Sequence, residues 1–107
     1  MSDLPTACLL LSSLLFAIGT LGVLTRRGAI AILMSIEIML NGGNLALVAA
    51  DRALAASGVS LTGDGQVFAL FVLAIAAAEA AIGLAIVIVL FRQRGSTDID
   101  LARLLRW

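Results

Sequence analysis

Glu37 and Glu79 each stand as the one charged residue within a long apolar run of this 107-residue chain. A charged side chain at the centre of a membrane costs roughly 2.5–3.5 kcal/mol on insertion scales, so a carboxyl group at that depth is expected to have a function. Burial away from water favours the protonated form of a carboxyl group. Each glutamate is therefore expected to load and release a proton. Two of them on neighbouring helices could pass a proton along, directly or through water.

The two glutamates are predicted to lie at similar depth. Glu37 follows Arg27 by ten residues, which is about 15 Å at the rise of an α-helix. Glu79 precedes Arg92 by thirteen residues, or about 20 Å by the same rise. Neither apolar run contains a Lys or Arg that could neutralise its glutamate. A proton or cation path is the favoured interpretation, and a pair of buried glutamates that only fix helix register is the alternative.

Polar and small residues accompany both glutamates. Asn41 and Asn44 follow Glu37 at intervals that place all three on one helical face, where the two amides could hold water or bond a partner helix. Gly42 and Gly43 lie beside them, where a helix can bend or another backbone can approach closely. Small side chains around Glu79 leave space for water or for a close neighbour: Ala76, Ala80 and Gly83.

The composition excludes several classes of protein. Hydrophobic residues make up 62% of the chain and charged residues 13%, with a mean hydropathy of +1.14. Soluble domains are about half apolar, and a chain this short cannot hide so much apolar surface from water. The net charge is zero, so no nucleic-acid partner is expected. With Cys8 as the one cysteine and no histidine, we expect no metal and no cofactor in this chain itself.

The hydrophobic pattern predicts an all-α integral membrane protein. Three apolar runs, at about residues 4–24, 29–50 and 67–91, are each long enough to cross a hydrocarbon core of roughly 30 Å as a helix. We expect residues 1–107 to form a single three-helix membrane domain, with residues 92–107 as its carboxyl-terminal tail.

The arginines predict the orientation of these spans. Arg26 and Arg27 fill the first link, where Gly28 is expected to help the chain turn, and four arginines follow the third span. Because positively charged loops stay on the cytoplasmic side, the amino terminus is predicted outside and the carboxyl terminus in the cytoplasm. The second link, residues 51–66, contains Ser57-Gly58 and Thr62-Gly63-Asp64-Gly65 and is predicted to form turns and a capped helix start.

These motifs resemble a known family. The stretch LMSIEIMLN at residues 33–41, followed by Asn44-Leu45, resembles the second span of the K subunit of proton-pumping NADH:quinone oxidoreductase. That enzyme is complex I, or NDH-1, and the mitochondrial counterpart of the subunit is the 4L chain. The stretches Gly65-Gln66-Val67 and AAAEAAIGLA at residues 76–85 are similar to its third span, and Arg26-Arg27 to its basic first loop. The ending Leu104-Leu105-Arg106-Trp107 is similar to cyanobacterial and plastid members, which reduce plastoquinone.

The resemblance implies a membrane-arm subunit that couples quinone reduction to proton translocation, with NADH, NADPH or ferredoxin as the electron source. It implies that Glu37 is a principal coupling carboxylate and Glu79 a supporting one, on a hydrated polar axis. Flavin mononucleotide, iron–sulfur clusters and quinone would lie in partner subunits. The implied partners are the antiporter-like subunits, the A, H and J type subunits and the lipid bilayer. The implied location is a bacterial inner membrane, or a thylakoid membrane for the cyanobacterial and plastid type.

Three other classes share part of this pattern. A small subunit of a multisubunit sodium/proton antiporter has the same three-span outline. A rotary-ATPase ring subunit also carries a membrane-embedded glutamate, but it typically has two spans and one such residue. A purely structural assembly subunit would tolerate glutamine in place of both Glu37 and Glu79.

Overall fold

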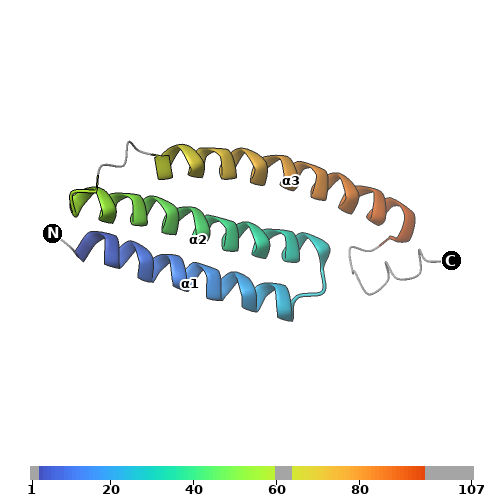
Figure 1. Cartoon of the computed structure of the whole chain (residues 1–107). Helices are drawn as coiled ribbons and strands as arrows, with labels where there is room; N and C mark the ends of the chain where they lie inside the picture. The colour runs from blue at the N-terminus through green and yellow to red at the C-terminus, as the bar shows by residue number, and fades with distance from the viewer. Residues whose placement is uncertain (1–2, 60–63, 96–107) are drawn as a thin grey trace.

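Three long helices make up the structure, a computed structural model that describes residues 3–59 and 64–95. Helix α1 spans Asp3–Thr25, α2 spans Ala29–Ala56 and α3 spans Asp64–Arg94 (Figure 1). All three are long and apolar enough to cross a membrane. The prediction of an all-α, three-span protein is therefore confirmed, while residues 96–107 of the predicted tail lie outside the described residues.

Two of the helices are longer than the apolar runs that predicted them. Helix α2 continues to Ala56 rather than ending at residue 50, and α3 begins at Asp64 and ends at Arg94 rather than covering 67–91. Hydropathy marks the part of a helix that lies in hydrocarbon, whereas backbone hydrogen bonds continue past it as long as the residues favour a helix. The extension of α2, DRALAA, consists largely of Ala, Leu and Arg, which are strong helix formers.

Glycine ends α2 at a defined point. The Val59 amide donates to the Leu54 carbonyl and the Gly58 amide to the Ala55 carbonyl, each at 3.2 Å. Gly58 has a φ of +85°, in the left-handed region that residues with a Cβ rarely adopt. This is the Schellman arrangement of a helix end, and it confirms the turn predicted at Ser57-Gly58. Gly28 differs, because its φ of −71° is open to any residue.

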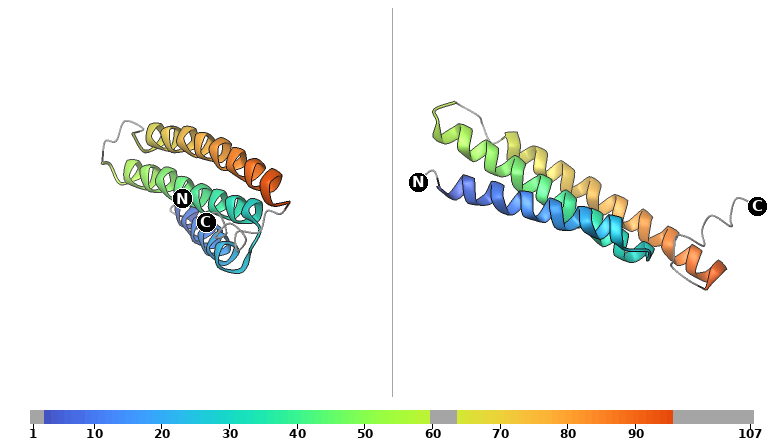
Figure 2. Two further views of the ribbon diagram at one scale, coloured as in Figure 1. Left: turned by 90° about the vertical axis from the view of Figure 1, so that its right-hand side faces the viewer. Right: turned by 90° about the horizontal axis from the view of Figure 1, so that it is seen from below.

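Helix α2 lies between α1 and α3, which both pack against it (Figures 1 and 2). Its two packed faces are opposite each other. The face toward α1 carries Ser35, Met39 and Gly42, which lie against small residues of α1. The face toward α3 carries Leu33 and Asp51, which lie against Gly83 and Gly65 of α3. The position of the α3 side chains relative to the rest of the bundle is therefore set mainly by the packing of α3 against α2.

Close backbone approach holds α1 to α2. The buried Ser12 hydroxyl donates to the Gly42 carbonyl at 2.5 Å, which joins the two helices directly. A Cβ placed on Gly42 would lie only 2.9 Å from the Ser12 carbonyl oxygen, and one placed on Gly19 only 2.7 Å from the Ser35 carbonyl oxygen. Small residues at these crossings allow the approach, as is usual between membrane helices. The close approach expected near Gly42 and Gly43 is thus confirmed at Gly42.

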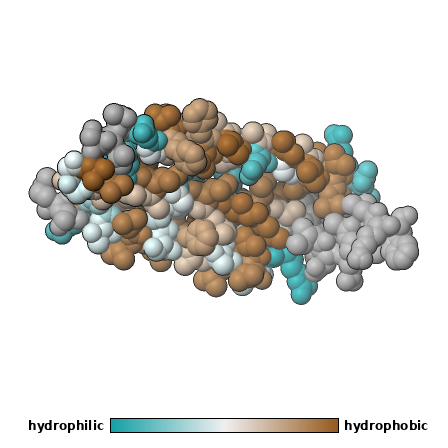
Figure 3. Space-filling view, viewed as in Figure 1, coloured by the Kyte–Doolittle hydropathy of each residue, from teal (hydrophilic) through white to brown (hydrophobic). Residues whose placement is uncertain are grey.

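The outer surface is largely apolar. Large hydrophobic side chains such as Leu4, Leu24 and Phe71 are 73%, 76% and 64% exposed, and brown hydrophobic atoms cover most of the face in Figure 3. Hydroxyl groups on this surface are satisfied within their own helix, because Ser13 and Thr20 donate to carbonyls four residues earlier. The chain thus presents to its surroundings a surface suited to lipid or to apolar faces of other membrane subunits.

The glycine pair on α2 offers a matched test of this packing. We expect Gly42→Val to lower the free energy of unfolding by about 1–3 kcal/mol, the usual cost of overpacking, because its side chain would collide with the Ser12 backbone. Gly43→Val should have little effect, since a Cβ on Gly43 would meet nothing within 4 Å. Thermal unfolding of both variants in detergent, followed by circular dichroism, measures the difference. Equal unfolding midpoints would contradict the α1–α2 packing described here.

Candidate functional site in the membrane-spanning helices

Glu37 belongs to a stripe of α2 side chains on the side of α3. Leu33 and Asp51, at the two ends of this stripe, contact α3, and the residues between them follow at alternating intervals of four and three, which keeps them on one helical face. We call it the α3-facing stripe, and its members are Leu33, Glu37, Leu40, Asn44, Leu47 and Asp51. Glu37 itself is half-buried.

Glu79 lies on α3 between two residues that pack toward α2. Ala76, three residues before it, is buried, and Gly83, four residues after it, lies against the Leu33 side chain. The Glu79 side chain is nevertheless exposed on the surface of the chain. This chain alone therefore leaves the Glu79 side chain uncovered, whereas Glu37 is half-buried. The small residues around Glu79 let α3 approach α2 but leave a long side chain uncovered.

The packing register brings the two glutamates to the same level. A Cβ on Gly83 would lie 3.0 Å from Leu33 Cδ1, and one on Gly65 would lie 2.6 Å from Asp51 Cβ. Leu33 precedes Glu37 by four residues, and Gly83 follows Glu79 by four. Asp51 follows Glu37 by fourteen residues, and Gly65 precedes Glu79 by fourteen. Since the helices are antiparallel with equal rise, both contacts place Glu37 level with Glu79.

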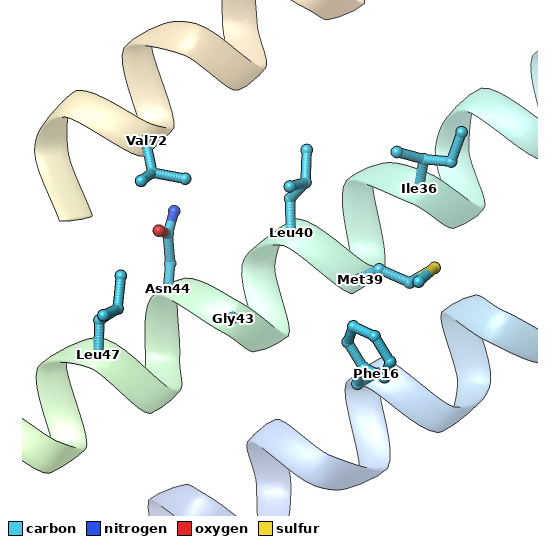
Figure 4. Close-up of a pocket in the computed structure, with 8 residues that line it drawn as sticks. All are labelled: Phe16, Ile36, Met39, Leu40, Gly43, Asn44, Leu47 and Val72. Atoms are coloured by element: carbon cyan, nitrogen blue, oxygen red, sulfur yellow. The ribbon is translucent and has the colours of Figure 1, made fainter. Parts of the chain in front are cut away.

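Asn44 and Asn41 have different environments. Asn44 is 8% exposed, and neither its amide nitrogen nor its amide oxygen has a hydrogen-bond partner among the described residues. Its side chain extends from α2 toward Val72 of α3 (Figure 4). Asn41 is exposed instead. The two asparagines of the predicted polar face therefore differ in exposure, because Asn44 is buried and Asn41 is not.

A groove runs along α2 beside Asn44. It has a volume of about 410 Å³ and extends from Ile36 to Leu47 along the helix, and Glu37 is not among the residues that line it. Phe16 of α1 and Val72 of α3 line its two sides (Figure 4). Apart from Asn44 its lining is apolar, so Asn44 supplies the polar side chain in this groove.

Asp51 is a polar residue of this region that the sequence interpretation missed. The hydrophobic pattern predicts it in the link after the second span, but it lies within α2 and is only 6% exposed. Its Oδ1 atom has no hydrogen-bond partner among the described residues. The signal that could have found it is the interval of seven residues that separates Glu37 from Asn44 and Asn44 from Asp51.

The arginines of the first link lie apart from the glutamates. Arg26 and Arg27 occupy the short connection between α1 and α2 and are exposed. Glu37 is ten residues further along α2 than Arg27, or about 15 Å away along the helix. The structure therefore keeps these positive charges at the end of the bundle, and it does not bring them to the level of Glu37 and Glu79.

Disulfide formation can test the register. In a Cys8→Ser background, the pair Leu33→Cys and Gly83→Cys should cross-link readily under mild oxidation, because the two positions are in contact. The pair Leu33→Cys and Leu90→Cys is the control, since Leu90 is buried but lies seven residues further along α3, about 10 Å away. Mobility on non-reducing gels reports the result. Preferential cross-linking of the control pair would contradict the common level of Glu37 and Glu79.

Comparisons with known proteins agree on one family. Residues 7–107 match the family described as NADH-ubiquinone/plastoquinone oxidoreductase chain 4L. The chain is 49% identical over 100 residues to NAD(P)H-quinone oxidoreductase subunit 4L of Synechocystis, covering 94% of this chain and 93% of the relative. It is 53% identical over 92 residues to NADH-quinone oxidoreductase subunit 11 of Thermus thermophilus, covering 86% and 90%. It is also 46% identical over 99 residues to subunit K 2 of Geotalea uraniireducens, covering 92% and 93%. The chain thus belongs to the family of NADH-ubiquinone/plastoquinone oxidoreductase chain 4L, and its bacterial relatives include subunit K of NADH-quinone oxidoreductase.

Proposed function

We propose that this chain is the 4L- or K-type subunit in the membrane arm of a proton-translocating NADH- or NAD(P)H-quinone oxidoreductase, and that Glu37 and Glu79 couple quinone reduction to proton movement. The observation that carries the proposal is the common level of the two carboxyl groups on adjacent helices. A single buried carboxyl group would be enough to fix the packing of two helices. Two carboxyl groups at the same level of adjacent helices are better explained by proton exchange between them.

The geometry supports proton sharing between Glu37 and Glu79. Packed helix axes lie about 8–10 Å apart, so side chains as long as glutamate can meet directly or through one water molecule. In a medium of low dielectric constant two negative charges at this separation repel strongly. An added or removed charge nearby would therefore drive a proton from one carboxyl group to the other.

The exposure of Glu79 explains why the site needs partner subunits. A carboxylate left against hydrocarbon is costly, and this chain does not cover the Glu79 side chain. A neighbouring membrane subunit would complete its surroundings and continue the proton path from there. We propose that the neighbours are the A, H, J and antiporter-like subunits, and that flavin mononucleotide, iron–sulfur clusters and quinone are bound in partner subunits rather than in this chain.

The proposed coupling begins at the quinone site of another subunit. Reduction of quinone there changes the electrostatic field at Glu37, which drives a proton from one glutamate to the other. The chain itself then acts without a redox group, as a translocase component. The amino terminus lies outside and the arginine-rich first link in the cytoplasm, in a bacterial plasma membrane or, for a chain of the cyanobacterial type, a thylakoid membrane.

Replacement of Glu37 tests this proposal. In membrane vesicles with the complex assembled, Glu37→Gln should reduce both quinone reduction and proton uptake by at least about tenfold, because glutamine keeps the size but cannot exchange a proton. Glu37→Asp should retain a large share of both rates, because a carboxyl group remains within reach. Simultaneous recording of quinone reduction and proton uptake gives the two values.

Asp3→Asn is the matched control. It makes the same change from carboxylate to amide in the first turn of α1, far along the chain from the glutamates, and both rates should stay at the wild-type level. Wild-type coupled rates in Glu37→Gln would refute the proposal and favour a structural assembly subunit. A sodium-dependent growth defect with normal NADH oxidation would favour an antiporter subunit.

A further inference from the structure

Three polar side chains occur at regular intervals along the α3-facing stripe. Glu37, Asn44 and Asp51 follow one another every seven residues, which keeps them on nearly the same face of α2 and about 10 Å apart along it. The first lies level with Glu79, and the last lies at the end of the bundle where α2 ends and α3 begins. The stripe therefore extends from the level of the two glutamates to one end of the bundle.

The second and third members of this series are buried, and each has at least one polar atom without a hydrogen-bond partner in the described part of the chain. Asn44 is 8% and Asp51 6% exposed, and both amide atoms of Asn44 and Oδ1 of Asp51 have no hydrogen-bond partner among the described residues. A buried polar group without a partner costs about 1–3 kcal/mol, and more if it is charged. In native proteins, such groups usually form hydrogen bonds with ordered water or with a bound ion. Two of them in sequence along one interface indicate water between the helices.

Asp51 is seated against the first turn of α3. The Gly65 backbone approaches it so closely that a Cβ there would lie 2.6 Å from Asp51 Cβ and 3.0 Å from its Cγ. The first turn of a helix has unpaired amide groups and a positive partial charge, which stabilise a nearby carboxylate. Two charged side chains are close in sequence, Arg52 beside Asp51 and Asp64 beside Gly65, and both are exposed rather than buried. Asp51 is thus the buried carboxyl group at this end of the stripe.

We propose that Asp51 is a third proton-exchanging carboxyl group, connected to Glu37 and Glu79 by water that Asn44 holds along α2. In one direction, a hydronium ion at the membrane face gives its proton to an Asp51 carboxylate oxygen and becomes water. Asp51 then releases that proton to the water chain, which delivers a proton to an ionised glutamate. The reverse sequence returns it, and no other reactant is needed. The proposal rests on the proposed function of the two glutamates, which lie at the inner end of this path.

The dimensions of the path are consistent with water. A gap of about 10 Å between successive polar groups exceeds a direct hydrogen bond and matches roughly three water molecules at 2.8 Å spacing. The groove of about 410 Å³, which Asn44 lines, runs from Ile36 to Leu47 and so extends along α2 over the length between Glu37 and Asn44 and part of the length between Asn44 and Asp51 (Figure 4). Asn44, with two donors and an acceptor at the middle of the path, would orient this water.

Thiol labelling tests for the water directly. In the assembled complex with Cys8→Ser, Asn44→Cys should react with a small, charged methanethiosulfonate reagent at least tenfold faster than Phe71→Cys, because the reaction requires a hydrated thiolate. Phe71 is the matched control, since it adjoins Val72 on α3 at the level of Asn44 but is 64% exposed on the apolar surface. Mass spectrometry of this chain over time measures the fraction that carries the reagent. Equal rates at the two positions would overturn the water path, whatever the role of Glu37.

Turnover measurements test the carboxyl group itself. Asp51→Asn should lower coupled proton translocation severalfold and Asp51→Glu should restore most of it, whereas Arg52→Gln, a neighbouring exposed charge, should match the wild type. Full coupling in Asp51→Asn together with loss in Glu37→Gln would overturn this path and leave the proposed function standing. Full coupling in both variants would overturn the proposed function as well. If Asp51→Asn prevents assembly, the labelling rates decide the proposal.

Discussion

The cost of placing a carboxyl group in a membrane is the constraint on which the rest of this structure depends. Neither of the apolar runs around Glu37 and Glu79 contains a Lys or Arg, so polar contacts for each carboxyl group must come from water, a neighbouring subunit or the other glutamate. The fold places both residues at one level along α2 and α3, with Glu37 half-buried and the Glu79 side chain exposed. A shift of α3 by one helical turn would separate them by about 5 Å.

Helix α2 serves two different purposes on its two faces. Toward α1 it presents Ser35 and Gly42, and the resulting contact is close and anchored by the hydrogen bond from Ser12. Toward α3 it presents the α3-facing stripe, in which polar groups alternate with leucines. The first face holds α1 close to α2. The second face, where Asn44 and Asp51 Oδ1 have no hydrogen-bond partner within residues 3–59 and 64–95, is where water and protons can be accommodated.

The sequence predicted the fold well because the bilayer imposes a simple rule on helix length and polarity. Apolar runs located the three spans, although α2 extends to Ala56 because helix propensity continues beyond the hydrocarbon. The candidate glutamates were also evident from sequence, since isolated charges in apolar runs are conspicuous. The environment of each polar side chain was not evident from the sequence. Asn41 and Asn44 look alike in sequence, yet one is exposed and the other buried, and the burial of Asp51 depends on the approach of Gly65 from another helix.

A double-variant cycle tests the central claim, that Glu37 and Glu79 act as one proton-sharing pair, most directly. Proton translocation would be measured for Glu37→Gln, Glu79→Gln and the double variant in assembled complex. Groups that act as a unit show strongly non-additive losses. The account predicts that the double variant loses no more than Glu37→Gln alone. Losses that multiply, as for two independent sites, would contradict it.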